Sequence, residues 1–436
     1  MRRDHLNFLR QWRNDPIRVP LMIRGARQVG KSWLVTAFGE EFEHFISINF
    51  EKDKRVHALF PDHIDIHKTL ETLRAYTKIP TISGKTLLFL DEIQECPNAI
   101  RYLRYFKEEL PELHVIAAGS LLEFTLEKLG VAVGRIDYLF LYPLSFMEFL
   151  TALNRDDLRE AITNKNIDAA SHEVLLEHLK NYMWLGGMPA VVSTWIQHRD
   201  FILCQRIQDR IIGNYEDDFQ KYAKKHQIET LGKVFRSIGK QLGKKFQYIN
   251  VDNDMKTYPI KQGLHLLIRA GVAHLCYHTS GHVYPLEAES NEKKFKVYLF
   301  DIGISHRLLG LDLAEWVTSP LHIDYLGESA EQLVAQELIA YGNPSKRGEI
   351  YYWHVESKSG NAEVDFIDVK ENKIVPIEVK SGVKGGMKSL NVFFETHPKA
   401  TYGVKISEMP FSRHGNLEEI PLYAVASWKK NQSSGY

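Results

Sequence analysis

The stretch Gly25-Ala26-Arg27-Gln28-Val29-Gly30-Lys31-Ser32 matches the phosphate-binding loop pattern G-x-x-x-x-G-K-[ST] at every fixed position. It follows a short apolar run, residues 19–23, and precedes a helix-like stretch that begins at Trp33, which is the strand–loop–helix context that the pattern requires. Glycines let successive backbone N–H groups face phosphate oxygens, and the N-terminus of the helix adds partial positive charge. The residues from Gly25 through Trp33 are therefore predicted to bind ATP.

Two side chains of this loop have specific predicted roles. Lys31 is expected to contact the β- and γ-phosphates and to act in catalysis, and the hydroxyl of Ser32 is expected to coordinate Mg²⁺. A glycine-containing turn with a coincidental lysine is the alternative interpretation. The complete match and its flanking pattern favour nucleotide binding.

A second motif lies where the apolar run Thr86-Leu87-Leu88-Phe89-Leu90 ends in Asp91-Glu92. An unbroken apolar run is typical of a strand buried on both faces of a parallel sheet, and ligands bind at the carboxyl ends of such strands. We expect Asp91 to hold Mg²⁺ through its water shell, and Glu92 to orient and deprotonate the attacking water. Alone, such a pair usually marks a strand that enters a loop. Downstream of a phosphate-binding loop it indicates a site of nucleotide hydrolysis.

Two further residues are candidates for contact with the γ-phosphate. Ser120 follows a third strand-like run, residues 114–118, where a polar residue senses this phosphate in P-loop ATPases that have an additional strand. Its alternative role is the N-cap of a helix from Leu121 onward, which serine favours. Arg135 would contact the γ-phosphate from the same or a neighbouring subunit, and a surface arginine is its commoner explanation.

The overall composition is that of an ordinary globular chain. Its 436 residues exceed what one hydrophobic core normally serves and suggest roughly two to four domains. Lys+Arg and Asp+Glu both total 55, so no overall field attracts the chain to nucleic acid or membrane, and any polyanion site must be local. Three widely spaced cysteines fit neither a disulfide framework nor a zinc site, which indicates a reducing compartment. With no signal peptide and no apolar stretch long enough to span a bilayer, the sequence predicts a soluble cytoplasmic protein without membrane contact.

The order of apolar patterns predicts four regions. Residues 1–154 alternate strand-like and helical patterns, which is the signature of a parallel α/β sheet. Residues 155–225 are helical throughout, with one break at Gly186-Gly187-Met188-Pro189 that reads most simply as a turn between helices. Residues 226–288 and 289–436 form two further predicted domains. The strands expected in the first region are residues 19–23, 45–49, 87–90, 115–118 and 138–141.

The region 226–288 suggests a winged helix-turn-helix. Helices are expected at 228–242 and 255–270, followed by a β-wing at 272–277 and 282–285. Winged helices often place the second helix in the major groove of DNA. The second helix carries few cations and follows two aspartates, so DNA contact and protein or interdomain contact both remain open.

The C-terminal third contains a second chemical constellation. Glu378 and Lys380 lie two residues apart on a strand-like run, so their side chains share a face. Asp365 on the preceding strand joins them if a turn near 371–372 closes a hairpin. Two carboxylates beside a lysine form a Mg²⁺ site next to an ammonium group that stabilises a developing anionic phosphate. This is the D…E-x-K arrangement of restriction-type nucleases, in which Glu331 from the preceding helix, expected at 326–341, would be a supplementary metal ligand.

Two other interpretations of this constellation stay open. A charged sheet edge would present the same residue types in water, although the retention of all three polar positions on one face argues against it. A relic nuclease fold that is now used only for binding would also retain them. Present-day cleavage is therefore a separate question from the nuclease-like fold.

With these segments in place, the chain resembles a prokaryotic family of predicted AAA+-type P-loop ATPases with a C-terminal restriction-endonuclease-like domain of unknown function. The resemblance covers nearly the whole length. It implies an ATPase core, a winged-helix middle and a nuclease-like end, but no settled biological role. It rests on the phosphate-binding loop and on the strings Leu90-Asp91-Glu92-Ile93-Gln94, Ala118-Gly119-Ser120, Gly134-Arg135, Tyr142-Pro143-Leu144-Ser145-Phe146, Gly186-Gly187-Met188-Pro189, Lys296-Val297-Tyr298-Leu299-Phe300-Asp301-Ile302-Gly303, Ala362-Glu363-Val364-Asp365 and Ile377-Glu378-Val379-Lys380-Ser381.

Two functions follow from these expectations. In the first, a Mg²⁺-dependent ATPase acts on or with DNA, and its nucleotide state controls a metal-dependent nuclease-like domain. In the second, a nucleotide-switched regulator binds a protein or DNA partner through its C-terminal domains without cleavage. Both predict an α/β fold with ATP and Mg²⁺ as ligands. A homo-oligomer and a protein partner both remain open.

Overall fold

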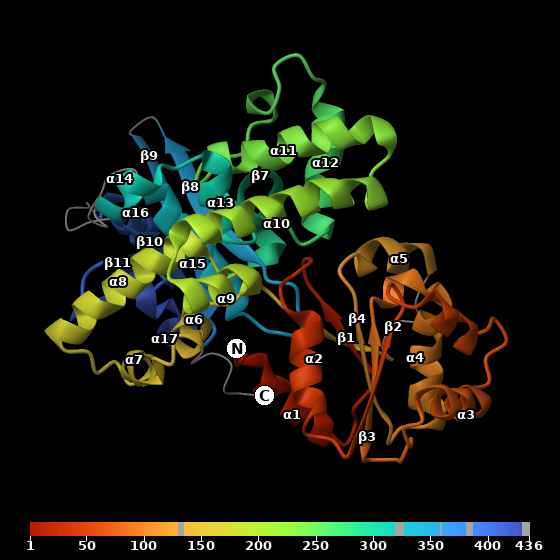
Figure 1. Cartoon of the computed structure of the whole chain (residues 1–436). Helices are drawn as coiled ribbons and strands as arrows, with labels where there is room; N and C mark the ends of the chain where they lie inside the picture. The colour runs from red at the N-terminus through yellow and green to blue at the C-terminus, as the bar shows by residue number, and fades with distance from the viewer. Residues whose placement is uncertain (130–134, 319–326, 358–359, 381–386, 430–436) are drawn as a thin grey trace. The chain divides into compact units, whose positions relative to one another are not determined.

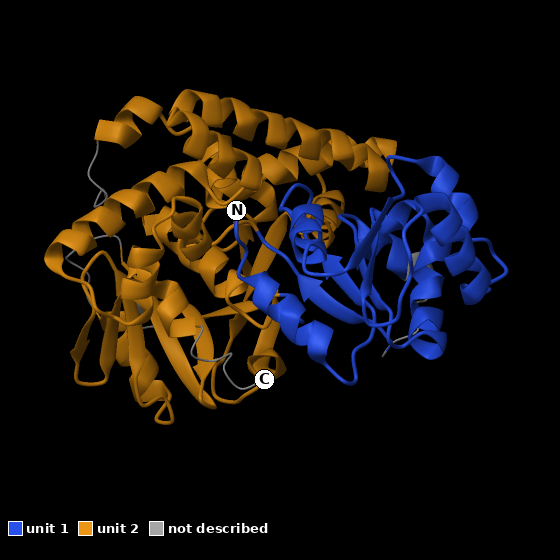
Figure 2. Cartoon of the chain, turned by 60° about the horizontal axis from the view of Figure 1, so that its bottom comes forward, with its two compact units in different colours: residues 1–142, 344–347 blue, residues 143–343, 348–436 orange. Residues whose placement is uncertain are grey.

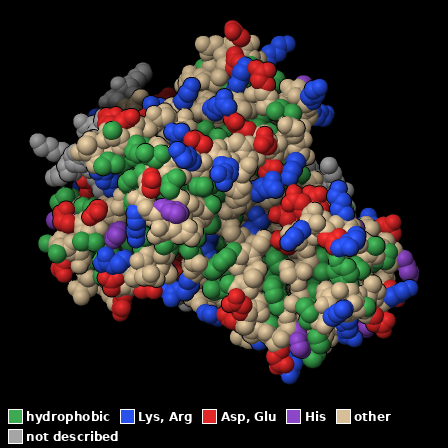
Figure 3. Space-filling model, in the orientation of Figure 1, with side chains coloured by type: hydrophobic (Ala, Val, Ile, Leu, Met, Phe, Trp, Pro, Cys, Tyr) green, Lys and Arg blue, Asp and Glu red, His purple; other side chains and the backbone are tan. Residues whose placement is uncertain are grey.

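The computed structural model describes residues 1–129, 135–318, 327–357, 360–380 and 387–429 (Figure 1). The chain divides into two compact units, which Figure 2 colours separately. Unit 1 comprises residues 1–142 and 344–347, and unit 2 comprises residues 143–343 and 348–436. No helix among the described residues is both long and apolar enough to cross a membrane. Acidic and basic side chains are interspersed over the face shown in Figure 3, in keeping with the balanced charge of the sequence.

Unit 1 is built on a five-stranded sheet with the order β2-β3-β4-β1-β5, in which every neighbouring pair is parallel. All residues of β3 and β4 are buried, which explains their unbroken apolar sequences. Strand β4 lies between β1 and β3, as expected of a P-loop ATPase with an additional strand. The strands are β1 (Leu21–Arg24), β2 (His44–Asn49), β3 (Thr86–Asp91), β4 (His114–Ala118) and β5 (Asp137–Phe140).

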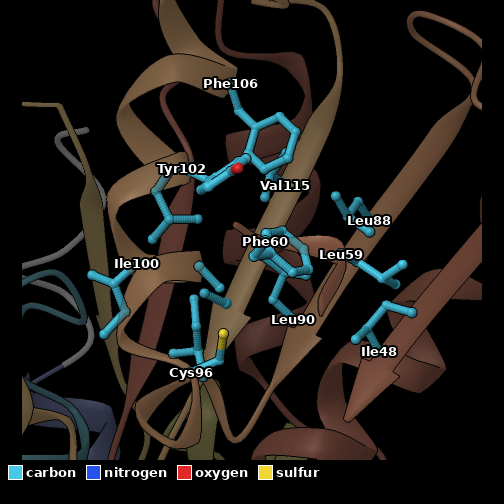
Figure 4. Packing of buried hydrophobic residues seen from close by; sticks show 14 of the residues in the cluster. Ile48, Leu59, Phe60, Leu88, Leu90, Cys96, Ile100, Tyr102, Phe106 and Val115 are labelled. Carbon is cyan, nitrogen blue, oxygen red and sulfur yellow. The ribbon is translucent and has the colours of Figure 1, made fainter. Parts of the chain in front are cut away.

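Helices pack around this sheet and complete the core of unit 1. The N-terminus of α4 begins with Pro97, whose fixed φ and missing N–H suit the first helical position. Figure 4 shows how Tyr102 and Phe106 of this helix pack with Phe60, Leu90 and Val115 in one buried cluster. The helices of unit 1 are α1 (His5–Asn14), α2 (Lys31–Gly39), α3 (Ile66–Thr77), α4 (Pro97–Glu109) and α5 (Leu122–Leu129).

Unit 2 begins with a run of helices, as the periodicity of residues 155–225 predicts. Helix α8 ends at Leu185 and α9 begins at Pro189, so the predicted break at the two glycines is confirmed. The helices of the region are α6 (Phe146–Ala152), α7 (Asp156–Thr163), α8 (Ala169–Leu185), α9 (Pro189–His198), α10 (Phe201–Tyr222), α11 (Ile228–Lys240) and α12 (Thr257–Arg269). Further along are α13 (Ile302–Leu309), α14 (Leu313–Thr318), α15 (Gly327–Ala340), α16 (Lys388–Thr396) and α17 (Val425–Lys429).

The remainder of unit 2 is a mixed eight-stranded sheet with the order β12-β13-β11-β10-β9-β8-β6-β7. Helix α16 contributes Leu390 and Phe393 to a buried cluster with Trp353, Val364 and Ile367 on the central strands. The strands are β6 (Ala273–Thr279), β7 (Ser290–Leu299), β8 (Ile350–Ser357), β9 (Gly360–Lys370), β10 (Lys373–Val379), β11 (Gly403–Ser407), β12 (Ser412–His414) and β13 (Leu417–Pro421).

The expected β-wing differs from the structure in its second strand. Residues 282–285 are not a strand, because the carboxylate of Glu289 accepts hydrogen bonds from the backbone of His282 and Val283 and closes a loop there. The antiparallel partner of β6 is instead β7, whose first residues are polar and exposed and therefore gave no apolar signal. Strand β6 also pairs with β8, so it belongs to the large sheet. The winged-helix interpretation of 226–288 and the four domain limits stay predictions.

The hairpin that the C-terminal site requires is present. Strands β9 and β10 are antiparallel, with Lys370 opposite Lys373. The two residues between them, Glu371 and Asn372, both have positive φ, of 52° and 61°, as a two-residue hairpin turn demands. The predicted fold class is thus confirmed: a parallel P-loop sheet, a helical middle and a C-terminal α/β region.

Candidate functional site

The phosphate-binding loop connects β1 to α2 and depends on glycine at its first position. Gly25 has a φ of 149°, and a Cβ atom there would lie 2.1 Å from the carbonyl oxygen of Leu141. Gln28 and Gly30 also have positive φ, of 66° and 96°. Arg3 is buried and donates to the carbonyl of Val29 at 3.0 Å, which braces the loop from behind. The loop backbone therefore has a conformation that requires glycine at position 25 and positive φ at three positions.

Lys31 begins α2 and folds back onto this loop. Its Nζ donates to the carbonyls of Gly25 and Ala26, at 3.0 and 2.8 Å. Burial lowers the pKa of Lys31 to about 8, although the nearby Glu92 and Asp91 act in the opposite direction. The negative charge of an anionic ligand would compensate the positive charge of this buried ammonium group and stabilise it.

Ser32, Asp91 and Asn49 form a connected polar group at the carboxyl end of the sheet. The Ser32 hydroxyl donates to Asp91 Oδ2 at 2.9 Å, and Asn49 Nδ2 donates to the same oxygen at 2.9 Å. Burial raises the pKa of Asp91, Glu92 adds to this effect, and the bonds from Ser32 and Asn49 oppose it. Hydroxyl and carboxylate oxygens are the donors that Mg²⁺ prefers, so these residues fit the predicted metal ion.

Asn49 was not predicted from sequence. It is the last residue of β2 and lies directly opposite Asp91 in the parallel register. One local signal existed, because a polar residue ends the strand expected at 45–49. That this strand lies beside the Asp91-Glu92 strand is decided by the order of the sheet.

Glu92 follows β3 and is held by a neighbour on the same loop. Its φ is 50°, in the left-handed region that non-glycine residues seldom adopt. Its Oε2 accepts a hydrogen bond from Gln94 Nε2 at 2.6 Å. Sequence reasoning quoted Gln94 only as part of a family string and gave it no role.

The remaining residues that were predicted to contact the nucleotide are Ser120, Arg135, Trp33 and Arg27. Ser120 lies two residues beyond β4, and the N–H of the preceding Gly119 donates to Ile23 at the end of β1. Arg135 forms an ion pair with Glu108 of α4. Trp33 is 44% exposed, and Arg27 lies 3.5 Å from Glu51. Gly134 and Ser381, which the family strings include, lie outside the described residues.

In unit 2 the structure brings the predicted carboxylate–lysine residues together. Glu378 Oε1 accepts from Lys380 Nζ, and Asp365 Oδ2 accepts from the backbone N–H of Val379 at 2.8 Å. Glu378 is buried, and its Oε2 has no hydrogen-bond partner among the described residues. Burial and the charge of Asp365 raise the pKa of Glu378 to about 7, against the opposing effect of Lys380.

Glu331 on α15 is part of the same buried group but is paired with residues that sequence reasoning missed. Its Oε2 accepts from Lys296 Nζ at 3.1 Å and from the Tyr298 hydroxyl at 3.0 Å. Lys296 also lies 2.7 Å from Glu363 Oε1, and its side chain is only 1% exposed. Burial and the charge of Asp365 raise the pKa of Glu331 to about 8, against the opposing effect of Lys296. Sequence reasoning quoted Lys296 only within a family string and gave it no role, because β7 was not predicted as a strand.

Lys296 changes which carboxylates of this buried group could coordinate a metal ion. Among the residues that the structure describes, no group of three or more His, Cys, Asp or Glu side chains is arranged to hold a metal. Lys296 supplies the positive charge beside Glu331, so Asp365 and Glu378 are the two carboxylates left for a cation. The predicted Mg²⁺ site of Glu331, Asp365 and Glu378 stays a prediction, with Lys296 as an additional cation beside Glu331.

Comparison with protein families divides the chain into three matched segments. Residues 18–150 match the model of an AAA domain. Residues 176–315 match a domain of unknown function (DUF8612), and residues 326–425 match a second domain of unknown function (DUF4143). A comparison with curated proteins gives no match.

Comparison with solved structures gives distant similarities. A Walker-type ATPase of Pyrococcus abyssi is 14% identical with a TM-score of 0.44, and the alignment covers 71% of this chain and 95% of that one. The ORC1 protein of Aeropyrum pernix in complex with DNA is 12% identical with a TM-score of 0.30, over 71% of this chain and 93% of that one. Neither similarity carries a functional argument at these scores.

Proposed function

We propose that this protein, a P-loop ATPase of the AAA type with a C-terminal domain of unknown function, couples Mg²⁺-dependent ATP hydrolysis in the cytoplasm to an action on or with DNA. The observation that carries the ATPase proposal is the convergence of Lys31, Ser32, Asp91 and Glu92 at one edge of the parallel sheet. Lys31 is buried among backbone carbonyls that a phosphate group would replace as its partners. The carboxylate of Asp91, at the end of β3, already accepts a hydrogen bond from the hydroxyl of Ser32.

The reaction follows from the positions of these side chains. Glu92 accepts a proton from water, whose oxygen forms a bond to the γ-phosphorus while the bond from that phosphorus to the β,γ-bridging oxygen breaks. ADP and inorganic phosphate are the products. Lys31 compensates negative charge on the β- and γ-phosphates. Ser32 and Asp91 would hold Mg²⁺, which supplies charge neutralisation on the phosphates when bound. Ser120 and Arg135 are proposed contacts of the γ-phosphate.

ATP turnover by the full-length protein tests this proposal. We expect phosphate release in the presence of Mg²⁺, with ATP binding lost in Lys31→Ala. In Glu92→Gln we expect ATP binding to be retained and turnover to fall at least about a hundredfold, because a general base contributes about 10²–10⁴ in rate. Glu95→Ala alters an exposed neighbour and serves as the control. Absence of nucleotide binding in the folded wild-type protein would refute the proposal.

The proposed DNA contact is the exposed face of α12 in unit 2. Lys256, Tyr258, Lys261 and His265 are exposed along this helix and its start. Lys244 and Lys245, which follow α11, are less available to DNA, because Lys244 pairs with Glu328 and Lys245 pairs with Glu356 within the same unit.

DNA binding is measured by fluorescence anisotropy with a short duplex at several salt concentrations. The double variant Lys256→Ala, Lys261→Ala should weaken binding and reduce the salt slope by about one per lysine that contacts a phosphate. Lys68→Ala removes an exposed lysine from α3 in unit 1 and serves as the control. If the double variant binds DNA with unchanged affinity, the proposed contact between α12 and DNA is refuted.

The alternative function is a nucleotide-switched regulator whose C-terminal region binds a partner without cutting. The pairing of Lys296 with Glu331 and Glu363 favours it, because this lysine supplies the positive charge that a nuclease would take from a metal ion. The Oε2 atom of Glu378, which has no hydrogen-bond partner in the described part of the chain, favours the nuclease. Incubation of supercoiled plasmid with wild-type protein, Asp365→Asn and Glu378→Gln in Mg²⁺ separates them. Nicking that either substitution abolishes supports the nuclease, and no nicking by wild type supports the regulator.

A further inference from the structure

The side chain of Gln94 lies between two parts of the nucleotide site that are far apart in sequence. At one end its Nε2 donates to Glu92 Oε2 at 2.6 Å. At the other end its Oε1 lies against Gly119, where a Cβ atom on that glycine would approach the oxygen to 2.1 Å. Gly119 immediately precedes Ser120, so Gln94 connects the glutamate after β3 to the segment after β4.

The residue at position 119 is small for reasons of space. Gly119 is not among the described glycines with positive φ, so its backbone conformation does not require glycine. The volume that a side chain would need is filled chiefly by the carboxamide of Gln94, whose Oε1 lies 2.1 Å from the Cβ position, and in part by Leu122 Cγ at 2.9 Å. The glycine and the glutamine therefore form a complementary pair, and each one explains the other.

This arrangement is locally unfavourable in two respects. The Oε1 atom of Gln94 is buried and has no hydrogen-bond partner among the described residues, and a buried acceptor without a partner is unfavourable. Glu92 has a left-handed backbone, a conformation that is rare for residues with a side chain. Such features persist where the surrounding structure imposes them, and they concentrate at functional sites.

We propose that Gln94 is a positioning residue that couples the Gly119-Ser120 segment to the carboxylate of Glu92. This proposal rests on the proposed role of Glu92 as general base. Through Gln94, the orientation of the Glu92 carboxylate depends on the position of the Gly119-Ser120 segment. One oxygen of Glu92 is fixed by the amide, which leaves the other oxygen to accept the proton of water. Movement of Gly119 is transmitted because the Gln94 amide occupies the space where a side chain of residue 119 would lie.

Three variants measured by steady-state ATPase kinetics test this coupling. Gln94→Ala removes the amide and should lower kcat about tenfold or more with little change in the KM for ATP. Gln94→Met fills a similar volume without an N–H donor and should lower kcat equally. Gly119→Ala displaces the amide and should reproduce the defect. The double variant Gln94→Ala, Gly119→Ala should be no slower than either single variant, because the amide that the added methyl group would displace is already absent and only the flexible side chain of Leu122, 2.9 Å from that position, must move.

The controls separate this inference from the proposed function. Glu95→Ala changes an exposed neighbour, and Gly213→Ala adds a methyl group to α10 with nothing within 4 Å of it, so both should retain wild-type kcat. If wild type does not hydrolyse ATP, the proposed function fails. If wild type is active, Glu92→Gln is inactive and Gln94→Ala retains full kcat, the coupling alone is refuted. Recovery of activity in Gln94→Met would show a packing role, and multiplicative defects in the double variant would show independent effects. Either outcome overturns the proposal.

Discussion

The buried carboxylate of Asp301 accepts a hydrogen bond from the backbone N–H of Gly187 at 2.7 Å, across 114 residues of sequence. The same side chain caps α13 by accepting from the N–H of Ile304 at 3.0 Å. The string at 186–189, predicted as a turn between helices, and the string at 296–303 are thereby found to be in contact. Asp301 fills the space that a side chain at Gly186 would need, and the backbone of Leu144 fills the corresponding space at Gly187.

The first prediction concerns the room at Gly186. A Cβ atom there would lie 2.1 Å from Asp301 Oδ1, and the residue has a φ of 75°. Gly186→Ala should therefore lower the free energy of unfolding by about 2–5 kcal/mol through backbone strain and overpacking. Gly232→Ala on α11 has nothing within 4 Å and is the control, expected to be neutral or slightly stabilising. Urea denaturation of the full chain measures both, and equal effects would contradict the close packing.

The second prediction concerns the pH dependence of stability. Burial raises the pKa of Asp301 from 3.8 to about 6, against the opposing backbone hydrogen bonds. An acid whose pKa is higher in the folded protein makes unfolding easier as pH rises between these two values, because the unfolded chain loses its proton first. Relative to Asp301→Asn, wild type should lose up to about 3 kcal/mol of stability across this window. Urea denaturation at pH 4, 5, 6 and 7 measures the difference, and parallel curves would contradict the burial effect.

The third prediction concerns proton uptake on ATP binding. The pKa of Lys31 is lowered to about 8 chiefly by burial, so part of the lysine is neutral above that pH in the nucleotide-free protein. ATP favours the charged form, and the Kd for ATP should rise with pH above about 8, approaching tenfold per pH unit. Calorimetry in two buffers of different ionisation enthalpy measures the protons taken up. Binding without proton uptake at pH 9 would be incompatible with a buried Lys31 at the phosphates.

The fourth prediction concerns Asn49, whose amide orients Asp91. Asn49→Ala removes one of the two hydrogen bonds to Asp91 Oδ2 and should raise the Mg²⁺ concentration needed for half-maximal ATPase activity about tenfold. Turnover at saturating Mg²⁺ should recover most of its wild-type value, since Glu92 is unchanged. Lys52→Ala, at an exposed position beyond β2, is the control. A fall in kcat that Mg²⁺ cannot restore would indicate a different role.

The sequence was informative wherever a motif is local. Glycine at position 25, the apolar run of β3 and the turn at 371–372 each encode backbone geometry within a few residues, and each lies where periodicity and turn chemistry predicted. The E-x-K spacing likewise placed Glu378 and Lys380 on one face, because side chains alternate along any strand.

Contacts between residues that are far apart in the sequence could not be predicted from local patterns. Asn49 and Asp91 meet because β2 and β3 are neighbours in the sheet, and strand order is not written in either strand. Lys296 reaches the carboxylate cluster because β7 pairs with β6, although its first residues are polar and carry no apolar signal.

What the sequence by itself determined is therefore the kind of each element and the chemistry of each motif, since both arise from steric and periodic rules that act over short distances. What only the tertiary structure decided is which polar groups are buried together. Gln94 and Gly119 explain one another only once β3 and β4 lie side by side. Lys296 becomes the internal cation of a carboxylate cluster only once strand and helix exclude water from around it.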